Sequence, residues 1–152
     1  MNLSVDIDIN GSAGKTWQVI SNIENATDNI SGIEEIEILE KPQNGLVGLK
    51  WRETRTLFGK TATEVMWITD AVENEYYKTR AESHGSVYVS KLMISETNGQ
   101  TRLTMDFGAK AQTFVAKILY VLMGFLFNGA TIKALKKDLD DIKIAVEKVK
   151  NR

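Results

Sequence analysis

The sequence predicts a single α+β domain over residues 1–152, in which a curved antiparallel sheet of about seven strands surrounds a long C-terminal helix. Three patterns predict this arrangement. An alternating segment at the start leads into two short helical segments, strands and turns follow one another from Ile33 to Lys110, and a helical period replaces the strand period after Lys110. No repeat, linker or low-complexity tract divides the chain, so one domain is expected.

The first strand is predicted over residues 3–9, where apolar and polar residues alternate as in a half-buried strand. Ser12 follows this strand after a glycine and is a suitable N-cap for a helix that continues to Ile23. The polar stretch 24–32 is expected to hold a second short helix. Two short helices therefore separate the first strand from the others.

Turn chemistry predicts how the remaining strands pair, because turn length sets the register and the register decides which side chains share a face. We expect two-residue turns at residues 58–59, 84–85 and 98–99, and a four-residue loop at 71–74. The turn at Asn98-Gly99 has the strongest signal, since a type I′ turn needs positive φ at both positions. The expected partners are Trp51 with Met66, Glu53 with Glu64, Arg55 with Ala62, Met66 with Thr79, Ile68 with Tyr77, Tyr77 with Leu92, Thr79 with Ser90, Ala81 with Tyr88, Leu92 with Met105, Ser90 with Phe107, Tyr88 with Ala109, and Ile94 with Leu103.

These registers place one continuous set of side chains on the more apolar face of the sheet. Our candidate ligand-binding residues from this face are Trp51, Glu53, Arg55, Glu64, Met66, Tyr77, Thr79, Tyr88, Ser90, Leu92, Met105 and Phe107. Glu53 and Glu64 lie directly opposite each other, and carboxylates in that position repel unless a cation separates them or one holds a proton. Arg55 could supply the cation. Two interpretations stay open: a polar anchor inside an apolar pocket, or an ion cluster at the sheet rim or, after a one-residue slip, in solvent.

The C-terminal part of the chain predicts an amphipathic helix. Its apolar residues recur at spacings of four and three and are Leu135, Leu139, Ile142, Val146 and Val149. The charged residues between positions 133 and 150 are assigned to the solvated face of this helix.

The preceding stretch, 114–127, is apolar nearly all round and is expected to be buried by protein. Its length of about 14 residues falls short of the ~20 that cross a bilayer, so no stable membrane insertion is expected. Leu119, Tyr120 and Met123 are expected to face a ligand. Gly124 and Gly129 could mark a kink or a close approach to the sheet.

Composition excludes several kinds of function. The formal net charge of −1 offers no basic patch for nucleic acid. The chain has no cysteine and one histidine, His84, which lies in a predicted turn, so we expect no metal site and no histidine-dependent catalytic triad. The absence of cysteine and of a basic, apolar leader favours a cytoplasmic location. The oligomeric state stays open.

A short motif suggests nucleotide binding but does not fit it. Residues 11–16 read Gly-Ser-Ala-Gly-Lys-Thr between a strand and a helix. A phosphate-binding loop needs a first glycine five residues before the Gly-Lys-Thr, and that position is Ile9. We therefore expect no nucleotide and no other cofactor.

The order of elements and several segments resemble the START-related (SRPBCC) superfamily, which contains polyketide cyclase/dehydrase-like proteins. The resemblance lies in residues 47–55 leading through Phe58-Gly59-Lys60 into 63–65, with 12–23 similar to the opening helix and 135–149 similar to the closing helix. It implies the helix-grip fold, with a cavity between sheet and long helix that binds lipids, polyketides or similar apolar molecules. These motifs are diffuse and imply no fixed catalytic residue.

Three functions follow from these observations. The first is binding or transport of a small hydrophobic ligand, without catalysis. The second is a polyketide cyclase or dehydratase, in which Glu53, Glu64 or Tyr77 acts as general acid or base and Arg55 polarises a carbonyl. The third is a protein-interaction module like the chaperone-ATPase activators of this fold, which a filled core and an exposed apolar patch at 114–127 would favour.

Overall fold

The computed structural model describes residues 2–57, 59–83 and 85–149, with the side chains of residue 57 and of residues 115–128 outside the description. The elements in chain order are β1 (Asn2–Ile9), α1 (Ala13–Ile20), the 3-10 helix η1 (Ile23–Asp28), β2 (Ile33–Glu40), β3 (Lys50–Leu57), β4 (Lys60–Val72), β5 (Tyr76–Ser83), β6 (Ser86–Thr97), β7 (Gln100–Ala111) and α2 (Phe114–Lys148). The predicted α+β architecture is confirmed.

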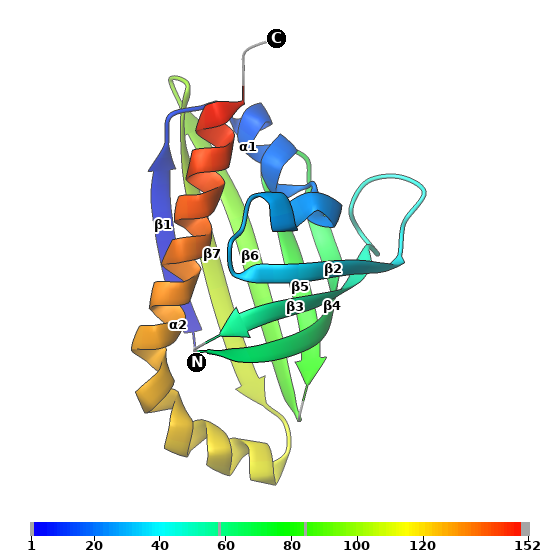
Figure 1. The fold of residues 1–152 in the computed structure, drawn as a ribbon, viewed down its shortest axis with the longest axis vertical. Helices are drawn as coiled ribbons and strands as arrows, with labels where there is room; N and C mark the ends of the chain where they lie inside the picture. Colours follow the sequence, from blue (N-terminus) through cyan, green and yellow to red (C-terminus); the bar gives the residue numbers. More distant parts are fainter. Residues whose placement is uncertain (1, 58, 84, 150–152) are drawn as a thin grey trace.

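The strands form one antiparallel sheet in the order β1-β7-β6-β5-β4-β3-β2. The sheet curves around α2, and the short helices α1 and η1 lie beside the C-terminal half of α2 (Figure 1). Helix α2 packs chiefly against β1, with further contacts to β7 and α1. The concave face of the sheet is therefore turned towards α2, and α2 contacts the sheet mainly at the edge formed by β1 and β7.

The registers predicted from residues 58–59, 84–85 and 98–99 are confirmed. Glu53 pairs with Glu64, Thr79 with Ser90, and Leu92 with Met105, as the turn lengths require. Asn98 and Gly99 both have positive φ, the backbone geometry of a type I′ turn. Phe58 and His84 themselves lie outside the described residues.

The predicted four-residue loop at 71–74 is wrong. Strand β4 continues to Val72, which pairs with Tyr76. Because the turn lies at residues 73–75, the pairing next to it is shifted by three residues, and an irregularity between Ile68 and Asp70 reduces this shift to two. Met66 therefore pairs with Ala81 instead of Thr79, and Ile68 pairs with Thr79 instead of Tyr77. Both errors shift the register by two residues, and an even shift keeps each side chain on its predicted face.

The first helix is shorter than predicted. Ser12 is its N-cap, with the side-chain oxygen accepting a hydrogen bond from the backbone N–H of Lys15, as expected. The helix ends at Ile20 and not at Ile23. Ile23 instead begins the 3-10 helix η1, where it is buried, so the apolar spacing that suggested one helix belongs to two consecutive ones.

The buried apolar residues form two clusters. The larger joins β1, α1, β6, β7 and α2 and consists of Val5, Ile9, Ile20, Leu92, Leu103, Leu139, Ile142 and Val146. The smaller consists of Ile23, Leu49, Trp51 and Ile68. Tyr77 packs against both clusters and connects them.

Helix α2 confirms the amphipathic pattern in its second half, where Leu139, Ile142 and Val146 are buried. At the other end, Phe114 is 78% exposed, because it begins the helix where no other described element covers it; the expected burial of 114–127 is therefore wrong at this residue. A side chain at Gly129 would meet no atom within 4 Å, so this glycine makes no close approach to the sheet. In the part of the chain that the structure describes, no helix is long and apolar enough to cross a membrane.

We predict that Leu139→Ala destabilises the protein by about 2–5 kcal/mol, because Leu139 is fully buried and truncation leaves a cavity. Ile144 provides a matched control on the same helix, since it is an isomer of leucine and is 53% exposed. Ile144→Ala should change the free energy of unfolding by less than about 0.5 kcal/mol. Urea denaturation measures both. Equal losses would contradict the assignment of the buried face.

Candidate functional site

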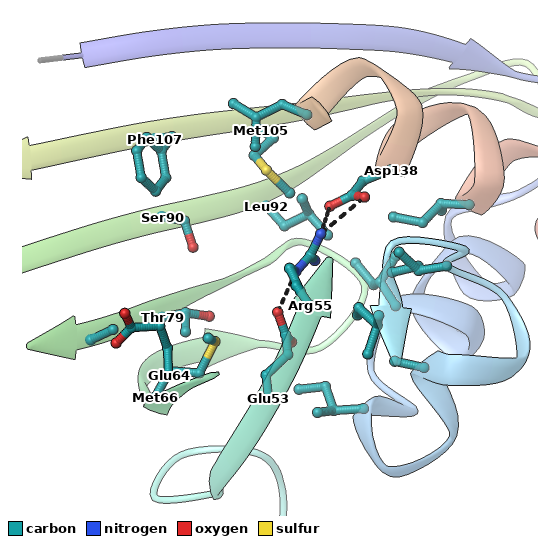
Figure 2. A pocket seen from close by; sticks show the side chains of 18 of the residues that line it. Glu53, Arg55, Glu64, Met66, Thr79, Ser90, Leu92, Met105, Phe107 and Asp138 are labelled. Atoms are coloured by element: carbon teal, nitrogen blue, oxygen red, sulfur yellow. Dashed lines mark hydrogen bonds and ion pairs between the residues drawn. The ribbon is translucent and has the colours of Figure 1, made fainter. Parts of the chain in front are cut away.

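A cavity of about 430 Å³ lies between the sheet and helix α2. All the candidate ligand-binding residues from the sheet line it, and these are Trp51, Glu53, Arg55, Glu64, Met66, Tyr77, Thr79, Tyr88, Ser90, Leu92, Met105 and Phe107. Figure 2 shows residues of this wall, with Leu92, Met105 and Phe107 on neighbouring strands. The side chains of Leu119, Tyr120 and Met123 lie outside the described residues.

The rest of the wall comes from residues that sequence analysis did not assign to the site. The segment from α1 to the start of β2 contributes Val19, Ile20, Asn22, Ile23, Ala26, Asn29, Ile30 and Ile33, the strands add Ala62 and Ala81, and α2 contributes Thr131, Ala134, Leu135, Asp138 and Ile142. The spacing of the apolar residues among them predicts that they are buried, but it does not predict which part of the protein they face. The cavity walls include members of both core clusters.

An ion cluster crosses the cavity from the sheet to the helix. The Arg55 Nε donates to Glu53 Oε2 at 2.5 Å, and its Nη1 lies 2.9 Å from Asp138 Oδ2. The indole Nε1 of Trp51 also donates to Glu53, at 3.3 Å. Figure 2 shows the Arg55 guanidinium between the two carboxylates. These groups face the cavity, so the alternative in which a slip turns them to solvent is wrong.

The electrostatics of the cluster follow from burial and from the two carboxylates. Burial by itself would lower the pKa of Arg55, but the charges of Glu53 and Asp138 outweigh it and raise that pKa above its usual value. Burial raises the pKa of Asp138, and the nearby Arg55 opposes this rise without cancelling it. Arg55 therefore stays charged and is the cation shared by Glu53 and Asp138, whereas it makes no ion pair with Glu64, the carboxylate that faces Glu53 across the strands.

The prediction that residues 133–150 carry a fully solvated set of charges is wrong at Asp138 and Asp141, which are both buried. The signal was present in the sequence. Asp138 follows Leu135 by three positions and precedes Ile142 by four, so it lies on the apolar face of the helix. A carboxylate on that face requires a partner inside the protein, and Arg55 is that partner.

A second set of contacts holds the segment between η1 and β2 against the helix. The backbone N–H and the hydroxyl of Ser31 both donate to Asp141 Oδ2, at 2.9 and 2.8 Å. Lys137 forms an ion pair with the same carboxylate. Burial would raise the pKa of Asp141, but the hydrogen bonds from Lys137 and Ser31 lower it overall. Because Asn29, Ile30 and Ile33 line the cavity, this clasp closes one of its sides.

Some of the remaining polar groups of the cavity wall have hydrogen-bond partners within the protein, and others do not. The Tyr77 hydroxyl donates to the carbonyl of Ile20 at 3.2 Å, and burial raises its pKa far above the usual value. The hydroxyl groups of Thr79 and Ser90 and the carboxylate of Glu64 make no hydrogen bond or ion pair within the described ranges. Thr79 is only 8% exposed. These three residues are therefore our candidates for polar contacts with a ligand.

We predict that Arg55→Met destabilises the protein by about 2–3 kcal/mol at neutral pH, because Glu53 and Asp138 lose their shared cation. The value lies below that of a fully buried pair because the Arg55 side chain is 23% exposed and partly screened. Arg52→Met is the matched control on the same strand, where Arg52 forms a surface pair with Glu37. It should cost less than about 1 kcal/mol by urea denaturation.

The loss in Arg55→Met should also depend on pH. A carboxyl whose pKa is raised by folding binds its proton more tightly in the folded state, so stability falls as the pH rises from the unfolded to the folded pKa. Removal of Arg55 extends that interval upward for Asp138, since Arg55 is what holds this pKa down. The deficit relative to the wild type should therefore grow as the pH rises towards neutral from about 4, the usual pKa of an aspartate. A deficit that shrinks over this range would show that the carboxyls are not held by Arg55.

The fold has solved counterparts, although no family model and no curated protein sequence matches the chain. A protein from Thermus thermophilus is similar with a TM-score of 0.80 at 12% identity, over 97% of both chains. The Zhui aromatase/cyclase from a Streptomyces species has a TM-score of 0.73 at 15% identity, over 97% of this chain and 93% of its own. A START superfamily protein from Mycobacterium smegmatis has a TM-score of 0.67 at 16% identity, over 93% of this chain and 98% of its own.

At these low sequence identities, structural similarity supports a shared backbone fold but not a shared chemistry of the site. The match extends over between 93% and 97% of this chain in each case. The chain therefore has the helix-grip fold of the START-related, polyketide cyclase-like proteins.

Proposed function

We propose that the protein binds or carries a small hydrophobic ligand in the cavity between the sheet and α2. The observation that carries this proposal is the cavity itself, whose volume of about 430 Å³ lies in the range of small-molecule sites. Its wall is mostly aliphatic, aromatic and methionine side chains with a few polar groups at separate points. Such a wall supplies affinity through apolar contact and orientation through the polar groups.

The clasp formed by Ser31, Lys137 and Asp141 supports a route for the ligand. These contacts are polar and lie between the segment before β2 and the helix, so they can be exchanged for contacts with water when the segment opens. Opening of this segment or of α2 would admit the ligand. The cytoplasmic location and the polyketide-like or lipid-like nature of the ligand stay predictions from the sequence.

The enzymatic alternative has weaker support. Of its four candidate residues, Glu53 and Arg55 bind each other, and Tyr77 donates its hydroxyl to a backbone carbonyl. Glu64 is left as the one candidate without a partner in the described residues, and acid–base chemistry on a polyketide-like substrate would depend on it. If Glu53→Gln and Glu64→Gln both left the rate of a cyclase or dehydratase reaction unchanged, these residues would not be the catalysts of that reaction.

The interaction-module alternative requires a filled core and an exposed apolar patch. Phe114 is exposed, but the open cavity argues against a filled core. The side chains of 115–128, on which the patch would depend, lie outside the described residues. Ligand binding is therefore the function with the most direct support.

We predict that the delipidated protein gains thermal stability with at least one apolar molecule from a panel of a sterol, an aromatic polyketide and a fatty acid. A ligand at about 100 times its Kd stabilises by about 2.7 kcal/mol. Thermal melting measures this gain, and native mass spectrometry of freshly purified protein tests for a retained molecule. Flat melting curves across the panel, with no retained molecule, would contradict the proposal.

A substitution that places a larger side chain in the cavity tests whether the ligand binds there. Ala134 lines the cavity on α2, and Ala134→Leu should reduce the ligand-induced gain by about 1.4 kcal/mol, which corresponds to tenfold weaker binding. Ala145→Leu is the matched control on the same helix, outside the cavity wall. It should leave the gain unchanged. An equal reduction in both variants would place the ligand elsewhere.

A further inference from the structure

The charges around the cavity are unbalanced. The charged side chains among the described lining residues are Glu53, Glu64, Asp138 and Arg55, so three carboxylates face one guanidinium. No lysine or histidine is part of this described wall. Even if Asp138 holds its proton, the excess is negative. A ligand that enters this cavity therefore meets a negative potential.

Arg55 is a poor receptor for an anionic ligand because two carboxylates already share its charge. Its Nε and Nη1 are bound to Glu53 and Asp138, and its charge is opposed from both sides. A carboxylate placed beside it would be a third anion around one cation. A ligand with a carboxylate headgroup is disfavoured for this reason.

Glu64 differs from the other two carboxylates because it has no partner within the described ranges. It lies opposite Glu53 in the ladder, and like charges in that position are destabilising. A cation beside Glu64 would relieve this repulsion. The buried Thr79 and its cross-strand neighbour Ser90 add hydroxyl oxygens that can accept hydrogen bonds from the same ligand.

A bound metal ion is a poor match for this arrangement. No group of three metal-ligating side chains converges among the residues described. An organic cation needs only one carboxylate and an apolar surface for its body, and the cavity offers both.

We propose that the ligand of this cavity is an apolar molecule with a basic nitrogen, and that Glu64 pairs with its ammonium group. This inference rests on the proposed function and specifies the ligand class. It distinguishes the cavity from one that selects fatty acids.

The test uses three fluorescent ligands that share one apolar body: anthracenemethanol, aminomethylanthracene and anthracenecarboxylic acid. At about pH 7 they are neutral, cationic and anionic. Fluorescence titration of the delipidated protein should give a Kd for the amine roughly tenfold below that of the alcohol, and a Kd for the acid roughly tenfold above it. Glu64→Gln should bring the amine to the affinity of the alcohol without changing the alcohol.

Glu35→Gln is the control for total charge, because Glu35 is exposed on β2 outside the cavity wall. It should leave all three affinities unchanged. If the alcohol binds but the amine binds no better, or if Glu64→Gln leaves the amine's advantage intact, the inference about Glu64 is wrong while ligand binding stands. If none of the three ligands binds, this inference is wrong, and so is the proposal that the cavity binds an apolar ligand of the size of anthracene.

Discussion

The position of Arg55 between Glu53 and Asp138 is the constraint on which the site depends. Glu53 and Arg55 belong to the sheet and Asp138 to the C-terminal helix, so the ion cluster fixes how these two layers face each other. The charges are largely buried, and separating them would leave a carboxylate without a cation in an apolar surrounding. The cluster thereby sets the position of α2 at the point where the helix bounds the cavity.

The cavity exists because the apolar residues do not meet in one continuous core. The two buried clusters join the helix to β1, β6 and β7 on one side, and η1 to β3 and β4 on the other. Tyr77 connects them, and its hydroxyl is held by the carbonyl of Ile20. The sheet curves between these two anchored regions (Figure 1). A cavity remains between its concave face and the helix. The unfilled space is what a ligand can occupy.

Much of the sheet face could be predicted because turns set registers by local backbone geometry. Asn98 and Gly99 favour positive φ whatever surrounds them, and the pairing of Leu92 with Met105 follows from that turn. The loop at 71–74 was mispredicted because strand β4 continues to Val72, and the irregular register near Ile68 was missed because it has no strong local signal. The prediction of the cavity wall was still correct, because a shift of two residues leaves each side chain on the same face of the sheet.

The sequence by itself determined the strands, most of their pairing, the long amphipathic helix and the carboxylate pair that faces one side of the sheet. These features depend on interactions between residues close in the chain or across a short turn. Only the tertiary structure decided that Asp138 completes the Arg55 cluster, that Asp141 holds Ser31, and that a cavity remains beside them. The reason is physical: a helical period shows that Asp138 lies on the apolar face, but the orientation of the helix over the sheet decides which cation it meets.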